Sequence, residues 1–338
     1  MAVYTTIDNP ELYFQTKLYT GNGSDGNAIT LDGSEDMQPN FLWIKERSTS
    51  NSHRVYDSVR GVNAALISNS TAAEDQYAAF GQLESFDSDG FTVGSGTSNG
   101  AGTNASSATI VAWCWKESAT AGFDIVTFTG NQTARTISHS LSAKPEWLWI
   151  KNREKVESWH MQHGALGATQ TAESNTTNAF GSGSTIWNDT EPTTSVFSVG
   201  TNGNINETGS DIIVYLWASK QGFSKVGGSY VGNGSSDGVY VHLGFRPAFV
   251  MIKSSSASST NWNIYDNKRD GFNGSNENLS ANLANAESSG NNRIDILSNG
   301  FKVRASTADV GTSSATYIYM AFAEAPFVNS KGVPCNAR

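Results

Sequence analysis

A short apolar stretch that ends in lysine occurs three times in this chain. It reads Phe-Leu-Trp-Ile-Lys at 41–45, Trp-Leu-Trp-Ile-Lys at 147–151 and Phe-Val-Met-Ile-Lys at 249–253. Successive copies lie about 100 residues apart, which is the length of one β-sandwich domain. The repetition predicts three tandem copies of a domain-sized unit.

Further strand patterns recur in the same order within each copy. A strand with a Phe-x-Val core precedes a closing apolar strand, which lies at 110–115, 212–217 and 317–322. The closing strand is apolar on both faces, so we expect it to be covered on both sides, whereas the Phe-x-Val strand is apolar on one face only. Two antiparallel sheets packed face to face explain both patterns.

The repeated stretch itself is predicted to be a core strand. Trp43, Trp149 and Met251 occupy the same position in the three copies. Alternation places them on one face and the neighbouring leucine, valine and isoleucine residues on the other. Because methionine replaces tryptophan, this position requires apolar bulk and not a ring for stacking. We therefore expect function to lie in the loops.

These patterns predict an all-β chain of three tandem β-sandwich repeats with short linkers, so the repeats should pack rigidly together. The prolines near the C-terminus favour an extended arm there. The expected units are an N-terminal arm at 1–14, repeats at 15–120, 121–221 and 222–325, and a C-terminal arm at 326–338.

A Gly-Asn pair follows an aromatic strand in each repeat, at 21–22, 130–131 and 232–233. It predicts a hairpin turn that requires a positive φ. The first pair also begins a match to the dinucleotide-binding pattern G-x-G-x-x-G. That pattern opens a helix in a nucleotide site, but a strand-like Ala-Ile-Thr-Leu run follows here, so a turn is favoured.

Composition excludes several classes of protein. Charged residues are 16% of the 338 residues, the net charge is −9, and no Lys/Arg run occurs, so neither nucleic acid nor an anionic membrane is an expected partner. No apolar stretch approaches membrane-spanning length, and no export signal is recognised. Two cysteines are too few for a disulfide framework. Cys114 aligns with Leu216 and Ala321, which predicts a buried, inert thiol.

No catalytic residue, metal or cofactor is expected. His160 and His163 are spaced to point to opposite faces of a strand, which disfavours a shared metal. Asp87 and Asp89 lack the further ligands of a calcium loop, so a solvated turn is favoured, although calcium binding by a loop stays open. A polysaccharide-degrading enzyme would need a carboxylate pair, which no short signature reveals and which the sequence does not exclude.

Trp187 is the one tryptophan singled out as a candidate contact residue. It has no clear aromatic counterpart in the other repeats, and Asn188 and Asp189 follow it. An exposed tryptophan in a polar loop is typical of sugar-stacking or protein-contact sites. We predict a receptor- or carbohydrate-binding site at these three residues, with ordinary packing against a neighbouring repeat as the equal alternative.

Five segments of the first repeat carry a family resemblance. They are Tyr-Thr-Gly-Asn-Gly-Ser at 19–24, Trp-Ile-Lys-Glu-Arg at 43–47, Tyr-Asp-Ser-Val-Arg-Gly at 56–61, Ser-Asp-Gly-Phe-Thr-Val-Gly at 88–94 and Val-Ala-Trp-Cys-Trp-Lys at 111–116. Together they resemble a repeated domain of marine tailed bacteriophages, found in virion and tail-associated proteins. The second repeat departs most from the pattern, with His-Gly-Ala-Leu-Gly at 163–167 in place of Asp-Ser-Val-Arg-Gly.

The resemblance implies a lectin-like sandwich of the jelly-roll or concanavalin A-like type. It further implies a non-enzymatic virion protein of the tail-fibre or spike type, located on the virion surface, that attaches the particle to its host. The expected partners are other virion proteins, further copies of the chain, with a trimer favoured, and a host surface glycan. A capsid or tail decoration or connector protein is the alternative.

Overall fold

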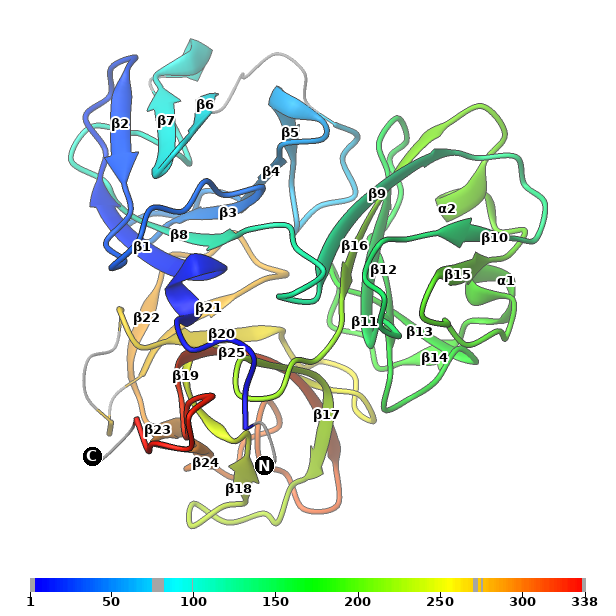
Figure 1. Cartoon of the computed structure of the whole chain (residues 1–338). Coiled ribbons are helices and arrows are strands. Elements are labelled where there is room, and N and C mark those ends of the chain that lie inside the picture. The colour runs from blue at the N-terminus through cyan, green and yellow to red at the C-terminus, as the bar shows by residue number, and fades with distance from the viewer. Residues whose placement is uncertain (1–3, 75–81, 99, 270–272, 275, 336–338) are drawn as a thin grey trace.

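The computed structural model describes residues 4–74, 82–98, 100–269, 273–274 and 276–335. Within them the chain is all-β, with six antiparallel sheets that form three sandwich-like units, as predicted. Each repeat contributes one larger and one smaller sheet. The three units surround a common centre as three lobes (Figure 1).

The strands of each repeat are divided between its two sheets. Repeat 1 forms sheets β1-β8-β3-β4-β5 and β2-β7-β6; repeat 2 forms β9-β16-β11-β12-β13-β14 and β10-β15; repeat 3 forms β17-β25-β19-β20-β21-β22 and β18-β24-β23. The bounds in repeat 1 are β1 (Phe14–Thr20), β2 (Asn27–Thr30), β3 (Phe41–Glu46), β4 (Arg54–Asp57), β5 (Gly61–Leu66), β6 (Gln82–Asp87), β7 (Gly90–Gly94) and β8 (Thr109–Trp115). Those in repeat 2 are β9 (Phe123–Thr129), β10 (Arg135–Ser138), β11 (Trp147–Asn152), β12 (His160–His163), β13 (Gln170–Glu173), β14 (Gly181–Ser182), β15 (Val196–Val199) and β16 (Asp211–Trp217). Those in repeat 3 are β17 (Ser224–Val231), β18 (Tyr240–His242), β19 (Phe245–Ser254), β20 (Asn263–Asp266), β21 (Asn276–Ser280), β22 (Ser288–Asn291), β23 (Ile294–Leu297), β24 (Gly300–Val303) and β25 (Thr316–Pro326).

Helices are few and short in the part of the chain that the structure describes. They are the 3-10 turns η1 (Pro10–Leu12) and η2 (Gly96–Ser98) and the one-turn helices α1 (Ser184–Trp187) and α2 (Gly203–Asn206). None of them is long and apolar enough to cross a lipid bilayer.

The repeated stretch forms the centre of each larger sheet and is buried on both faces. In β3, Leu42 and Ile44 pack inside their own sandwich against Phe91. Trp43, on the opposite face, points away from that sandwich into a core shared by the repeats. The closing strand β8 lies beside β3, with Trp113 opposite Trp43, and is buried on both faces in the same way. The alternation predicted from the sequence is confirmed.

The shared core joins all three repeats in a closed ring. Trp43 of repeat 1 lies against Trp149 of repeat 2, with ring centroids 5.1 Å apart. Trp147 of repeat 2 lies 6.1 Å from Trp262 of repeat 3, and Phe249 of repeat 3 lies 5.8 Å from Trp113 of repeat 1. Each repeat therefore contacts both others, and the larger sheets face inward around a pseudo-threefold centre.

One hydrogen bond per repeat follows the same cyclic order. The residue just before the fourth strand of each repeat is tryptophan in repeats 2 and 3 and histidine in repeat 1. Its ring nitrogen forms a hydrogen bond with a backbone carbonyl of the neighbouring repeat. The pairs are Trp159 Nε1 to Ile67 O at 2.9 Å, Trp262 Nε1 to Thr176 O at 3.2 Å, and His53 Nε2 to Ser280 O at 3.1 Å. The ring is thus closed by polar as well as apolar contacts.

The recurring Gly-Asn pairs do not form the hairpins that we expected. In repeat 1 the chain crosses from β1 in the larger sheet to β2 in the smaller one. Gly21, Gly130 and Gly232 do not have positive φ values. A Cβ at these glycines would lie 2.1–2.3 Å from a backbone carbonyl oxygen of a facing loop. Glycine is required there because the two chain segments approach so closely.

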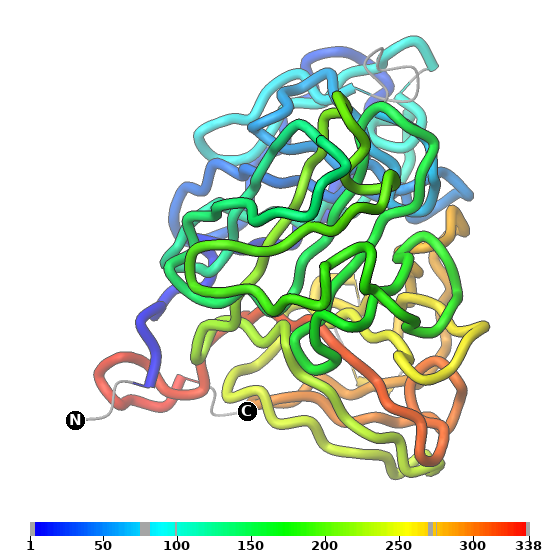
Figure 2. The backbone as a smooth tube through the Cα atoms, turned by 90° about the vertical axis from the view of Figure 1, so that its right-hand side faces the viewer, coloured from blue at the N-terminus to red at the C-terminus, as the bar shows by residue number. Residues whose placement is uncertain are grey.

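Both terminal segments fold back onto the protein. The C-terminal residues form a small hairpin, in which Val328 pairs with Pro334, and not the extended arm that we expected. Ser330 N and Oγ donate to the Asp8 carboxylate at 2.7 and 2.5 Å. Figure 2 shows the N-terminal segment meeting this hairpin on one side of the molecule. Residues 1–3 and 336–338 of the expected arms lie outside the described part of the chain.

Candidate functional site

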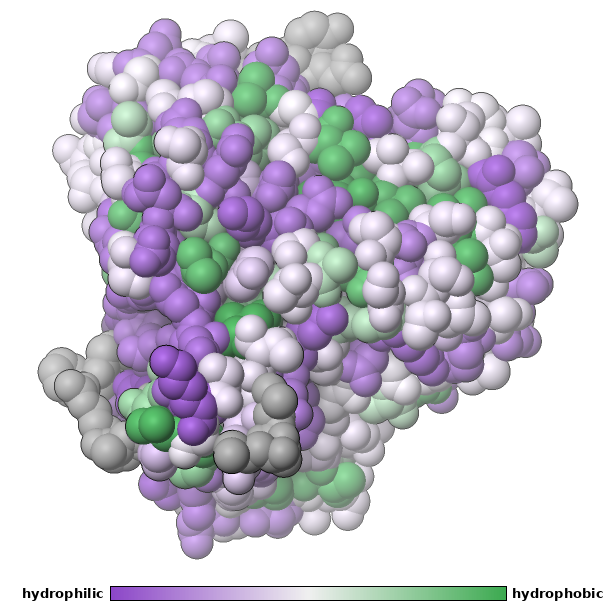
Figure 3. All heavy atoms as spheres, in the orientation of Figure 1, coloured by the Kyte–Doolittle hydropathy of each residue, from purple (hydrophilic) through white to green (hydrophobic). Residues whose placement is uncertain are grey.

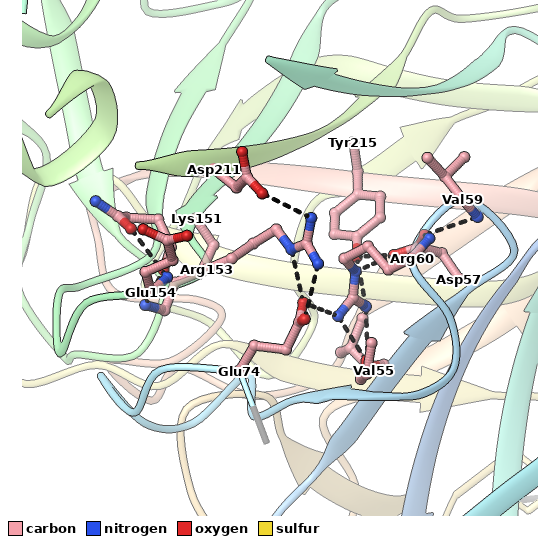
Figure 4. Close-up of polar contacts among 12 residues, drawn as sticks. Val55, Asp57, Val59, Arg60, Glu74, Lys151, Arg153, Glu154, Asp211 and Tyr215 are labelled. Carbon is pink, nitrogen blue, oxygen red and sulfur yellow. Dashed lines mark hydrogen bonds and ion pairs between the residues drawn. The ribbon is translucent and has the colours of Figure 1, made fainter. Parts of the chain in front are cut away.

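A buried cluster of ionised side chains lies where repeat 1 meets repeat 2 (Figure 4). Asp57 ends β4, and its Oδ1 accepts from the backbone N–H groups of Val59 and Arg60 at 3.1 and 2.9 Å. This turn holds Arg60 so that its Nε donates to Asp57 Oδ2 at 2.5 Å. Tyr215 of repeat 2 donates its hydroxyl to the same oxygen at 2.6 Å.

Glu74 extends the cluster across the seam. It accepts from Arg60 Nη1 at 2.9 Å and from Arg153 of repeat 2 through Nε and Nη2, each at 2.8 Å. Arg153 also lies 3.8 Å from Asp211 on the outer side. Bidentate contact of this kind fixes the guanidinium orientation as well as its position.

Burial and charge pairing set the ionisation of the cluster. The Arg60 and Asp57 side chains are 0% exposed and that of Glu74 is 3% exposed. Burial alone would raise the pKa of Glu74, but hydrogen bonds from Arg153 and Arg60 outweigh it and lower that pKa. Burial likewise opposes the charge on Arg60, yet Tyr215, Asp57 and Glu74 raise its pKa. Glu74 and Arg60 are therefore held in their charged forms.

The cluster has no oxygen free for acid–base chemistry. Both oxygens of Asp57 and both oxygens of Glu74 accept hydrogen bonds from groups within the protein. A general base needs access to the proton that it abstracts. A hollow of about 160 Å³ lies beside the cluster, lined by Glu74, Arg153, Asp211 and two neighbours, and opens to solvent. The geometry fits a lock between repeats better than a catalytic centre.

The lysine that ends each repeated stretch also has a structural role. Lys45 Nζ donates to Glu46 O and Thr49 O at 2.5 and 3.2 Å. Lys151 and Lys253 cap loop carbonyls in the same manner. Burial lowers the pKa of each of these lysines to about 8.

The predicted exposed tryptophan is buried. Trp187 ends the one-turn helix α1 and is 0% exposed, within the apolar core of repeat 2 beside Phe197 and Ile186. The expectation of an exposed ring for sugar stacking is therefore wrong, because the helix turns the indole inward. Asn188 and Asp189 are exposed and adopt left-handed conformations, with φ of 53° and 47°. Their role in binding stays a prediction.

The other candidate residues have satisfied surroundings. Cys114 is buried and burial raises the pKa of its thiol, whereas Cys335 is exposed and forms no disulfide. Asp87 accepts from Ser85 Oγ and Thr92 Oγ1, and Asp89 accepts from Met37 N. Among the described residues, no group of three or more His, Cys, Asp or Glu side chains is placed to hold a metal ion.

Burial lowers the pKa of both His160 and His163 to about 4. These imidazoles are therefore neutral at physiological pH. His160 and His163 lie at the two ends of the short strand β12, where they pair with Ile150 and Trp147 of β11 respectively.

The sequence did not lead us to the ionic cluster. The sequence feature that marks the cluster is the pattern Asp-x-x-Arg at 57–60, which recurs at 266–269. In repeat 2 His163 and Leu166 stand at the two positions. The presence of this pair in two copies and its joint loss in the third indicate a coupled role. Glu74 and Arg153 are 79 residues apart and carry no local mark of their pairing.

The fold and this cluster define a class of protein: three β-sandwich repeats locked into one ring by buried contacts. The family model for a domain of unknown function, DUF7483, matches residues 9–326, and the chain belongs to that family. The match covers all three repeats. No curated protein matches the chain.

Proposed function

We propose that the protein is a tail-associated bacteriophage virion protein that attaches the particle to a host surface through loops of its sandwiches. The observation that carries the proposal is the arrangement of the sheets. Because the larger sheets face a shared core, the smaller sheets and their connecting loops face outward on three sides (Figure 1). One rigid chain thus offers three sets of polar loops.

Such an arrangement suits multivalent binding. Several weak contacts on one rigid body raise the overall affinity, because each further contact forms at high effective concentration. The face drawn in Figure 3 is mostly hydrophilic, with hydrophobic residues in scattered groups, as suits a glycan-rich surface. Assembly of several chains, with a trimer favoured, would multiply the contacts further and belongs to the same proposal.

A binding assay with the recombinant chain tests this proposal. The chain is immobilised, and host envelope polysaccharides and a glycan array are applied. We expect retention above that on a heat-unfolded sample. Absence of retention for every host surface component would contradict the attachment role.

A paired variant locates the contact. Asn188→Gly with Asp189→Gly removes both side chains and suits the left-handed backbone at these positions. We expect weaker retention than for wild type. Ser314→Gly, at an exposed left-handed position of repeat 3, is the matched control and should bind normally. Equal binding by both variants would remove residues 188–189 from the site.

A connector or decoration role is the second candidate. It is favoured by the pairing of Asp8 with Ser330, which brings the two terminal segments together. In this role the paired segments would serve as one docking element. Deletion of residues 327–338 leaves β25 intact and should abolish incorporation into particles, while circular dichroism shows a folded chain. Normal incorporation of the truncated chain would contradict the docking role of the terminal hairpin.

A further inference from the structure

The three seams of the ring can be compared position by position. A backbone hydrogen bond marks the same place in each: Glu74 N to Arg153 O at 2.7 Å, Glu287 N to Arg47 O at 2.9 Å, and Phe180 N to Ser255 O at 3.0 Å. Strand register fixes the other equivalences, because Asp57, His163 and Asp266 lie opposite Phe41, Trp147 and Phe249 respectively.

We name two faces for each seam. The latch face holds the residues equivalent to Asp57, Arg60 and Glu74, and the receiving face holds those equivalent to Arg153 and Tyr215. Latch faces are Asp57, Arg60 and Glu74 in repeat 1, His163, Leu166 and Phe180 in repeat 2, and Asp266, Arg269 and Glu287 in repeat 3. Receiving faces are Arg47 and Trp113 in repeat 1, Arg153 and Tyr215 in repeat 2, and Ser255 and Met320 in repeat 3.

The seam between repeats 3 and 1 reproduces the ionic cluster of the first seam. Arg269 Nε donates to Asp266 Oδ2 at 2.6 Å, and its Nη1 donates to Glu287 at 2.7 Å. Arg47 of repeat 1 donates to Glu287 through Nε and Nη2 at 2.8 and 2.5 Å. Trp113 Nε1 takes the place of the Tyr215 hydroxyl, donating to Asp266 Oδ2 at 2.9 Å.

The seam between repeats 2 and 3 has lost every charge of the cluster. Leu166 and Phe180 pack against the shared apolar core. His163 is neutral, since burial lowers its pKa, and its Nδ1 accepts from Ala165 N. Ser255 and Met320 replace the arginine and the polar aromatic residue on the receiving face. All five positions differ together.

We propose that these faces form a pairing code that fixes the order of the repeats around the ring. An ionic latch face carries two carboxylates and one guanidinium, and the receiving arginine neutralises the remaining charge. Against Ser255 and Met320 that charge would be buried without a partner, and against the apolar latch face a receiving arginine would lose the latch carboxylate that accepts from its guanidinium. The first mismatch carries the large cost of an unpaired buried charge, and the second loses charge-assisted hydrogen bonds, whereas replacing a whole ionic cluster by apolar residues is tolerated.

Full-length variants at the first seam test the code. The receiving variant is Arg153→Ser with Tyr215→Met, the latch variant is Asp57→His, Arg60→Leu and Glu74→Phe, and the combined variant carries all five changes. We expect each partial variant to lower the melting temperature by several degrees or more, and the combined variant to recover at least half of the summed loss. A combined loss equal to the sum of the partial losses would overturn the proposal.

A reverse exchange and a yield measurement complete the test. Ser255→Arg with Met320→Tyr gives repeat 3 an ionic receiving face against an apolar latch face, and it should lower the melting temperature. Full tolerance of that change would count against the code. Where a partial variant yields no folded protein, soluble yield replaces the melting temperature. Recovery in the combined variant supports the code, and equal loss in all variants overturns it.

Discussion

Lys253 shows how a single buried side chain holds a loop and a seam together. Its Nζ donates to Thr260 O at 2.9 Å, to Thr260 Oγ1 at 2.6 Å and, across the seam, to Thr177 O at 3.2 Å. The same lysine ends the repeated stretch in every copy, although tryptophan and methionine interchange two positions earlier. The sequence is therefore fixed at the capping lysine, whereas the position that faces the shared core accepts either an aromatic or an aliphatic side chain.

Lys253→Met should destabilise the protein by about 1–3 kcal/mol, because it removes the donor to the buried Thr260 O and Thr260 Oγ1. Lys331→Met, at an exposed position of the C-terminal hairpin, is the control and should change stability little. Chemical unfolding measures both variants. Equal stability of the two would show that the lysine cap contributes nothing.

The two histidines of β12 predict how stability depends on pH. Because burial lowers the pKa of His160 and His163 to about 4, the unfolded chain binds protons between pH 6.5 and 4 that the folded chain does not. Stability should therefore fall as the pH falls through this window. We expect His160→Gln with His163→Gln to lose less stability than wild type between pH 7 and 5 in thermal melts. Equal losses of stability in the double variant and in wild type would contradict this origin of the pH dependence.

At the scale of strands and turns, the close approach at the Gly-Asn pairs defines where the chain changes sheets. A Cβ on Gly130 would lie 2.1 Å from Glu207 O, and one on Gly232 would lie 2.3 Å from Thr312 O. The facing atoms are backbone, so they cannot move aside as a flexible side chain can. The loop that precedes each closing strand is thereby held against the end of the first strand.

Gly130→Ala and Gly232→Ala should each destabilise the protein by about 1–3 kcal/mol through this overpacking. Gly181→Ala is the matched control, since no atom lies within 4 Å of its Cβ and its φ is not positive. Urea unfolding should show a change of about 0.5 kcal/mol or less for the control. Similar effects at all three positions would contradict the proposed close approach.

Strand patterns could be predicted from the sequence because their information is local. Alternation in β3 and β8 and the shared position of Trp43, Trp149 and Met251 indicated the buried sheets correctly. The turn prediction failed because the constraint on Gly21 comes from a loop more than 80 residues away. Trp187 was misjudged for a similar reason, since only the helix α1 decides that its ring points inward.

At the scale of the whole molecule, the arrangement of the repeats could not be predicted from any one segment. Arg47 and Glu287 meet across 240 residues of sequence, and neither lies in a recognisable motif with the other. Alignment of the three copies reveals which residues pair across the seams only once the positions of the seams are known. The ring then explains why the second repeat departs from the pattern at 163–167, because that segment faces a receiving surface without arginine.

A shared core also predicts how the protein unfolds. The inward faces of the three larger sheets belong to one continuous cluster of buried residues, which includes Trp43, Trp149 and Met251. Loss of one repeat would expose the inward faces of the other two, so partly unfolded rings should be unstable. Independent repeats joined by linkers would instead unfold separately.

Differential scanning calorimetry of the full-length chain tests most directly whether the three repeats form one locked body. We predict a single transition whose van't Hoff enthalpy equals the calorimetric enthalpy. Two or three resolved transitions, or a van't Hoff enthalpy near one third of the calorimetric value, would contradict the closed ring.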